Sequence, residues 1–174
     1  MTAKPLFISH ISEEAEIAVL LKGMIQEDFL DLATCFASSD IGSIGAGENW
    51  LTAIKDAMSE AKAVIVLCSK ASVHRPWVQF EVGAAWMKGV GIIPVCHSGM
   101  KVEELQMPLS LHQGLELGSQ QGLTKLYDGI AQILKIGRPK LADLPERLRR
   151  IRQIEDRFRL SQIQQFELFM SVPG

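Results

Sequence analysis

The sequence predicts an α/β protein in which helices cover both faces of a parallel sheet. Short apolar runs that suit buried strands alternate with longer segments whose apolar residues recur at helical spacing. One run, AVIVLC at Ala63–Cys68, is continuously apolar and rich in β-branched residues, as expected of a strand covered on both faces. This alternation is typical of parallel sheets, because helices form the crossovers between parallel strands.

Two strand–helix units are predicted in the first part of the chain. The first joins a strand at Pro5–Ser9 to a helix that begins near Ser12. The second joins a strand at Asp31–Ala37 to a helix with Glu48 in its first turn. A loop rich in Gly and Ser, Ser38–Gly47, connects this second pair.

The third strand, Ala63–Cys68, is followed by a predicted helix at Ser72–Met87 that is apolar nearly all round. Pro76 suits its first helical position, where a missing N–H does no harm. A fourth strand is predicted at Ile92–Cys96, and the proline within it suggests a sheet edge or a strand end.

Beyond Cys96 the pattern weakens and then recovers. Gly99–Gln113 is expected to be a loop with about one helical turn, and Gly114–Leu117 a short fifth strand. Apolar residues from Leu123 to Leu134 indicate a closing helix. Gly137–Pro145 is interpreted as a linker, and Glu146–Met170 as a helix with six arginines.

Composition bounds the class of protein. The chain has 174 residues, 47% hydrophobic and 22% charged, which suits one globular domain with an appendage. A net charge of −2 gives no bulk basic field for nucleic acid. No apolar run is long enough for a membrane span or a signal peptide, so a cytoplasmic location is expected. Cys35, Cys68 and Cys96 lack paired spacing, which favours buried thiols over a disulfide or zinc site.

Ligands of such sheets bind at the carboxyl ends of the strands, near the point where the strand order reverses. Three segments that follow strands should gather there: Ser9-His10, the loop Ser38–Gly47 and the loop before Trp77. Glu81 lies in this part of the chain, one helical turn after Trp77 and so on the same stripe. A lone carboxylate on an apolar helix must sit in a polar cleft, pair with a cation or titrate upward.

Four motifs, in this order and spacing, resemble the Toll/interleukin-1 receptor (TIR) domain of the bacterial type. Phe7–His10 resembles the first box, with His10 where many relatives have tyrosine, and SSDIGSIGAGENW resembles the BB loop. AVIVLCS resembles the third strand with its trailing serine, and Trp77–Glu81 the segment of the catalytic glutamate of NAD-consuming members. The resemblance covers roughly the first 135 residues, so we expect a TIR domain at 1–136 and a linker with an arginine-rich helical tail at 137–174.

The resemblance implies a flavodoxin-like five-stranded sheet with helices on both faces. It also implies cleavage of the nicotinamide–ribose bond of NAD+, giving nicotinamide and ADP-ribose or a cyclic isomer, in bacterial antiphage defence. NAD+ would be the substrate, with no cofactor and no metal. Active relatives assemble, and the BB loop of one subunit completes the site of the next, which implies self-association through Ser38–Gly47 and leaves room for a sensor or effector partner.

Glu81 is the expected catalytic residue, because a carboxylate beside the ribose can stabilise the positive charge that grows at the anomeric carbon. The alternative is a structural salt bridge, to Arg75 or to Lys88. Trp77 either walls the substrate pocket or fixes the helix to the sheet, and His10 either contacts substrate or is a plain loop residue. The expected substrate-binding residues are Ser9, His10, Ser38, Asp40, Ile44, Trp50 and Trp77.

The loop Ser38–Gly47 lacks the third glycine of G-x-G-x-x-G, and Glu48 would repel a phosphate at the start of the helix. A mobile gate, or a surface that docks on a neighbour, suits the loop better than a phosphate cradle, and a flexible connector is the alternative. The apolar Ile41 and Ile44 favour the gate.

Two other functions compete with the enzyme. A non-enzymatic TIR adaptor would act by TIR–TIR association alone, whereas Glu81 favours an enzyme. A response-regulator-like receiver would need clustered acids at strand ends, and Ser9-His10 stands there instead. The arginine-rich tail is expected to pack on its own domain or on a second copy, with an acidic partner or a membrane surface as alternatives. The product linkage and the activating signal cannot be inferred from these residues.

Overall fold

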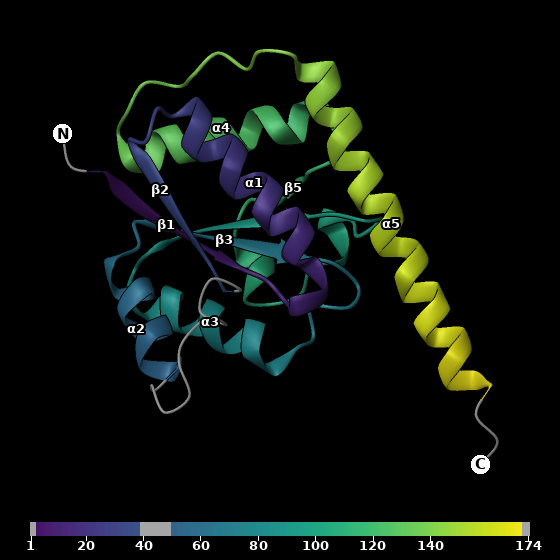
Figure 1. Ribbon diagram of the computed structural model, residues 1–174. Helices are drawn as coiled ribbons and strands as arrows, with labels where there is room; N and C mark the ends of the chain where they lie inside the picture. The colour runs from purple at the N-terminus through teal and green to yellow at the C-terminus, as the bar shows by residue number, and fades with distance from the viewer. Residues whose placement is uncertain (1–2, 39–49, 172–174) are drawn as a thin grey trace.

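The computed structural model describes residues 3–38 and 50–171, and its centre is a parallel sheet (Figure 1). Within these residues the sheet has five strands in the order β2–β1–β3–β4–β5, so the direction of winding reverses between β1 and β3. The predicted flavodoxin-like five-stranded fold is therefore confirmed. The strands are β1 (Lys4–Ser9), β2 (Ala33–Ala37), β3 (Ala63–Cys68), β4 (Gly91–Cys96) and β5 (Leu115–Glu116).

Helices cover both faces of the sheet, as predicted. On one face lie α1 (Ala15–Asp28), α4 (Gln120–Leu134) and the first half of α5 (Leu144–Met170), and on the other lie α2 (Trp50–Glu60) and α3 (Pro76–Met87) (Figure 1). Successive strand residues point to opposite faces, so Leu6 and Ile8 pack in the α1 layer while Phe7 packs in the α3 layer.

Two element boundaries differ from the sequence expectation for backbone reasons. β2 begins at Ala33, because Leu30 and Asp31 adopt left-handed conformations, with φ of 49° and 58°, that turn the chain after α1. The helix expected from Ser72 begins at Pro76, because the residue before a proline is pushed out of the helical region. Arg75 accordingly has an extended backbone.

The prediction that the proline marks a sheet edge or a strand end is wrong, because Pro94 lies inside β4 (Gly91–Cys96). β4 lies between β3 and β5 in the described sheet. β5 pairs only with Val95 and Cys96, however, so the outer side of Pro94 has no strand neighbour. This short partner strand explains how a proline is tolerated in an inner strand.

α3 is apolar nearly all round, but only one side of it is buried. Val78, Glu81, Val82 and Ala85 face the sheet layer. Phe80, Trp86 and Met87 expose 54%, 56% and 79% of their surfaces. The helix that carries Glu81 therefore also presents an apolar outer surface.

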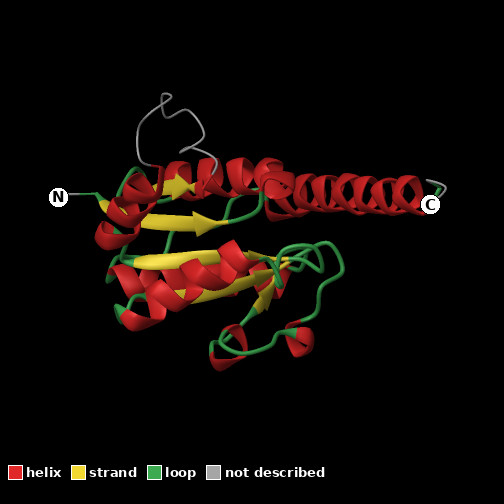
Figure 2. Cartoon of the chain, turned by 90° about the horizontal axis from the view of Figure 1, so that it is seen from below, coloured by secondary structure: helices red, strands yellow, loops and turns green. Residues whose placement is uncertain are grey.

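The segment Gly99–Gln113 contains two 3-10 turns, Val102–Glu104 and Leu109–Leu111, where one helical turn was expected. The final helix, α5, begins two residues earlier than expected and extends beyond the domain at its C-terminal end (Figure 2). None of the described helices combines the length and apolarity that crossing a bilayer requires. Cys35, Cys68 and Cys96 are buried, which confirms the expectation of buried thiols.

The first half of α5 is held to α1 and α4. Both guanidinium NH groups of Arg147 donate to the two carboxylate oxygens of Asp28, at 2.6 and 2.7 Å, and the Tyr127 hydroxyl donates to the same carboxylate at 2.6 Å. Leu148 and Ile151 are buried in the core on this face. The division at residues 136 and 137 stays a prediction, and the tail shares the core of the domain.

Candidate functional site

Glu81 is buried without exposed surface on the sheet-facing side of α3, and both of its carboxyl oxygens accept hydrogen bonds. The Trp77 indole N–H donates to Oε1 at 2.7 Å, one helical turn away. The Ser9 hydroxyl donates to Oε2. The Ser38 hydroxyl can donate its hydrogen bond either to the Glu81 carboxyl group or to the Ile8 carbonyl oxygen, which lies 3.2 Å away.

These donors come from separate segments that the sheet brings to one edge. Ser9 is the last residue of β1, and Ser38 directly follows β2. Trp77 lies in the first turn of α3, the helix that follows β3. The cluster therefore lies at the carboxyl ends of β1 and β2, beside the point where the strand order reverses, which is where such sheets bind ligands.

Burial sets the protonation of this acid. Desolvation raises the pKa of Glu81 from 4.5 to about 7, and the hydrogen bonds from Ser9, Trp77 and Ser38 offset only part of the rise. The salt-bridge alternative is wrong for both cations considered. Arg75 pairs with Glu13 at 3.2 Å, and Lys88 donates to a serine hydroxyl on α2.

No lysine, arginine or histidine in the described parts of the chain lies within salt-bridge distance of Glu81. The carboxyl group therefore titrates near neutral pH with only hydroxyl and indole donors around it. Such a group can exchange these donors for the hydroxyls of a sugar, and it can stabilise a positive charge placed beside it.

The other predicted site residues divide into two groups. His10 is buried, its backbone N–H lies 3.4 Å from the Ser38 hydroxyl, and its ring Nδ1 lies 2.7 Å from the Ile11 carbonyl oxygen. Its role in substrate binding stays a prediction. Asp40 and Ile44 lie outside the described residues, as does the loop after Ser38, and only the backbone of Trp50 is described, at the start of α2.

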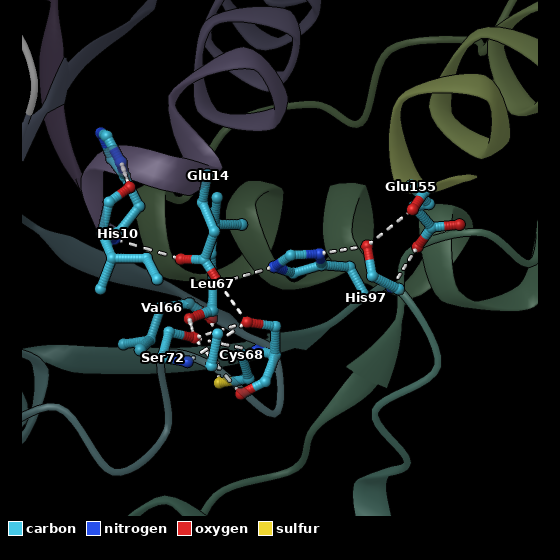
Figure 3. A network of polar contacts seen from close by, with 12 residues as sticks. His10, Glu14, Val66, Leu67, Cys68, Ser72, His97 and Glu155 are labelled. Atoms are coloured by element: carbon cyan, nitrogen blue, oxygen red, sulfur yellow. Dashed lines mark hydrogen bonds and ion pairs between the residues drawn. The ribbon is translucent and has the colours of Figure 1, made fainter. Parts of the chain in front are cut away.

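A second buried acid, Glu14, lies at the same edge of the sheet and is the centre of a larger polar network (Figure 3). Its carboxylate accepts from the Ser69 hydroxyl at 2.6 Å and from the Ile11 backbone N–H at 3.1 Å. His97 Nε2 lies 3.0 Å from the same carboxylate. Ser72 adds a hydroxyl 3.2 Å from that of Ser69.

This network reaches α5. His97 Nδ1 lies 2.9 Å from the Ser98 hydroxyl, and the Ser98 backbone N–H donates to the Glu155 carboxylate at 3.0 Å (Figure 3). The His97 ring also meets the edge of Phe158, with centroids 5.4 Å apart. The contacts join the ends of β3 and β4 to the tail helix.

The pKa values of the two buried acids, Glu14 and Glu81, are shifted in opposite directions. Burial acts to raise the pKa of Glu14, but the hydrogen bond and charge of His97, with the hydroxyls of Ser69 and Ser72, outweigh it and lower that pKa. Glu14 is thus an ionised, paired group, which suits a structural role. Glu81 has no such partner, and opposite shifts in neighbouring carboxyls are a common sign of different roles.

Glu14 lies at the start of the first predicted helix, two residues after Ser12, and its position in the sequence did not identify it as a site residue. The signal was present, because Ser69 follows β3 and His97 follows β4 directly, as His10 follows β1. Parallel strands bring such positions together. Among the residues that the structure describes, no group of three His, Cys, Asp or Glu side chains is placed to hold a metal ion.

Comparison with known proteins places this arrangement in context. Residues 6–131 match the family model of the TIR domain. No curated protein matches the chain. The structure is similar to the TIR domain of the Toll-related receptor TRR-2 from Hydra magnipapillata, with a TM-score of 0.59 and 13% identity, over 77% of this chain and 99% of that one.

Two further solved structures are similar. A metazoan TIR-STING receptor from C. gigas aligns with a TM-score of 0.51 and 24% identity. The alignment covers 79% of this chain and 42% of that receptor. The TIR domains of the activated Roq1 resistosome align with a TM-score of 0.44 and 11% identity, over 87% of this chain and 98% of that one. At these identities, the likeness to the TRR-2 and TIR-STING structures shows a shared fold.

Proposed function

The chain belongs to the TIR domain family, and on that premise we propose that it cleaves the nicotinamide–ribose bond of NAD+ with Glu81 as the catalytic residue. One observation carries the proposal. Glu81 is a buried carboxyl group without a cationic partner in the described structure, held by Ser9 and Trp77 at the ligand-binding edge of the sheet. Glu14, by contrast, has the His97 imidazole 3.0 Å from its carboxylate.

In the proposed reaction, the bond between the anomeric carbon of the ribose and the pyridinium nitrogen breaks. The bonding electron pair stays on that nitrogen, so nicotinamide leaves as a neutral molecule and needs no proton from a general acid. The ionised Glu81 carboxylate stabilises the oxocarbenium-like charge that develops on the ribose. Water then captures this carbon and gives ADP-ribose with release of a proton, or a nucleophile within the same molecule captures it and gives a cyclic isomer.

The surrounding residues have separate roles in this proposal. Ser9 and Ser38 hold the carboxyl group until ribose hydroxyls replace them, and the half-buried Trp77 fixes its orientation and walls the pocket. A cationic substrate beside Glu81 favours the ionised form and so draws its pKa below about 7.

Access to Glu81 requires a change of conformation, because its side chain has no exposed surface. We therefore propose that this conformation is silent and that assembly opens the site. Self-association through the loop Ser38–Gly47, most of which lies outside the described residues, is the proposed trigger. The exposed Phe80, Trp86 and Met87 on α3 support assembly, since apolar side chains grouped on a surface mark contact sites. Bacterial antiphage defence is the proposed setting, and a sensor or effector protein the proposed partner.

A non-enzymatic adaptor is the second candidate, and one observation favours it. Glu81 is fully enclosed, with donors on both oxygens, as a structural acid in a pure association module would be. Both functions need self-association, so measurement of assembly alone does not distinguish them.

The deciding experiment measures nicotinamide release from NAD+ at high protein concentration, for the wild type and for Glu81→Gln. The exposed Glu60, at the end of α2, gives the matched control Glu60→Gln. We expect release by the wild type and the control, and loss of about two orders of magnitude or more in Glu81→Gln. Equal release by all three proteins would exclude Glu81 as the catalytic residue, and absence of release by assembled wild type would favour the adaptor.

A further inference from the structure

The C-terminal end of α5 projects beyond the rest of the domain (Figure 2). It carries large apolar side chains that are exposed. Six of them expose 55–79% of their surfaces: Leu160, Ile163, Phe166, Leu168, Phe169 and Met170. At 100° per residue, all but Leu168 fall on one side of the helix. We call these five residues the apolar end of α5.

This surface is large enough for a stable interface. A large apolar side chain has roughly 150–200 Å² of surface, so the apolar end offers about 500–700 Å². Apolar patches on monomers reach only about 300–600 Å², and a standard interface buries about 800 Å² on each partner. With the polar residues between them, the side chains match what one partner contributes to a dimer.

A groove lined in part by apolar residues lies beside α5. It encloses about 480 Å³ between the loops that follow β3 and β4 and the middle of α5. Ala71, Gly99, Phe158 and Ile163 are among its apolar lining residues. It is partly open to solvent, and its volume is sufficient for two large side chains.

Charge distinguishes between the possible occupants of the groove. Residues 160–170 carry one charged residue, Glu167, and no lysine or arginine. A membrane surface would require cations beside the apolar face of the helix, so this segment does not suit one. The groove, by contrast, is lined by two cationic residues with exposed side chains, Lys70 and Arg159. In the described parts of the chain, Lys70 forms an ion pair with the exposed Glu104 and Arg159 with the exposed Asp156, both at the surface.

We infer that a second copy of this chain occupies the groove, in a twofold-symmetric dimer whose α5 helices run antiparallel. Each copy has both the groove and the apolar end. A twofold axis therefore places the apolar end of each copy at the groove of the other, and the assembly is complete with two subunits. Pairing centred on Ile163 places Glu167 of one copy level with Arg159 of the other. A parallel arrangement would bring the two Glu167 carboxylates together, which like charges oppose.

This dimer is separate from the self-association proposed for the loop Ser38–Gly47. The two surfaces share no residue, and the α5 contact closes after two subunits whereas a head-to-tail loop contact does not. Disruption of one surface should therefore leave the other unchanged, and neither depends on NAD+ or on the catalytic role of Glu81.

The test is the molar mass of the full chain, measured by sedimentation velocity over a wide concentration range without NAD+. We expect a dimer for the wild type and a monomer for Phe166→Glu combined with Phe169→Glu, with dimerisation weakened by about a hundredfold or more. Leu168→Glu is the matched control, because it places the same charge on the other side of the helix, and it should stay dimeric.

A second pair of variants tests the register. Glu167→Arg should weaken the dimer several-fold, and addition of Arg159→Glu to the same chain should restore it, because the two charges are exchanged across the twofold axis. All these positions are exposed, and circular dichroism verifies that each variant is folded. A monomeric wild type at every concentration would overturn the inference, as would a dimer that survives the double phenylalanine change or dissociates equally in the Leu168 control.

Discussion

Replacement of Glu81 by glutamine should make the protein more stable at alkaline pH, although it removes the proposed catalytic group. The pKa of Glu81 is raised from 4.5 to about 7 by burial, so the folded chain binds this proton more tightly than the unfolded chain. The neutral side chain is therefore the form that the fold prefers. Glutamine has the same shape, can accept from the Trp77 N–H and can donate to the Ser9 hydroxyl.

The sign and size follow from proton linkage. Stability from this group is fully present below about pH 4.5 and is lost as the pH rises through about 7. Each pH unit between the two pKa values costs 1.36 kcal/mol, so the ionised carboxylate destabilises the wild type by about 3 kcal/mol above that range. Glu81→Gln has no carboxyl group to ionise at this position and should unfold at a temperature roughly 6–10 °C higher than the wild type at pH 8.

The assay is urea and thermal unfolding of both proteins at a series of pH values from 4.5 to 8.5, at constant ionic strength. The stability difference should be near zero at the acid end and grow through neutral pH. Glu14→Gln is a control of opposite sign, because the pKa of Glu14 is lowered and its ionised form pairs with His97. Its loss of stability should be largest above about pH 4.5, where Glu14 is ionised in the wild type, and should shrink as the pH falls below that value. A stability gain for Glu81→Gln that is the same at every pH, or a loss at pH 8, would refute this reasoning.

Three further changes test other contacts. Trp77→Phe removes an N–H that stabilises the ionised form of Glu81, so the pKa of Glu81 should be higher in this variant than in the wild type. An unchanged midpoint in a carbon-13 NMR titration of the Glu81 carboxyl group would contradict this. Arg147→Met leaves the carboxylate on α1 without its cation and should lower the free energy of unfolding in urea by about 2 kcal/mol, where a loss below about 0.5 would count against the pair. Gly122→Ala would place a methyl group 1.8 Å from a backbone oxygen and should lower the free energy of unfolding by more than about 2 kcal/mol. Gly129→Ala, whose methyl group would have its nearest atom at 3.5 Å, should instead stabilise α4 by up to about 1 kcal/mol. Equal thermal shifts for the two variants would contradict the packing.

Much of the fold follows from residue patterns that act locally. Ala63–Cys68 is a strand over the predicted residues, because a continuous β-branched run can be satisfied only by burial on both faces. Pro76 occupies the first position of α3, which its fixed φ suits, although the predicted helix was drawn from Ser72. The two-residue β5 could not be bounded in this way, because it pairs only with Val95 and Cys96 and has no pattern of its own.

The candidate site was predictable to the extent that it depends on helix spacing and sheet topology. Spacing of four placed Trp77 against Glu81, and the rule for strand ends placed Ser9 and Ser38 near both. Side-chain partnership was not predictable, because the contact between Glu14 and His97 joins residues 83 positions apart through packing alone. For the same reason the sequence could not show that Arg75 and Lys88 pair with other residues and not with Glu81.

The most direct test of the central claim is nicotinamide release from NAD+ by the assembled wild type and by Glu81→Gln at pH 8. The variant should be the more stable of the two proteins at this pH, so unfolding would not explain a lost activity. We predict that the variant releases nicotinamide at least about a hundredfold more slowly than the wild type. Equal rates would contradict the assignment of Glu81 as the group that cleaves NAD+.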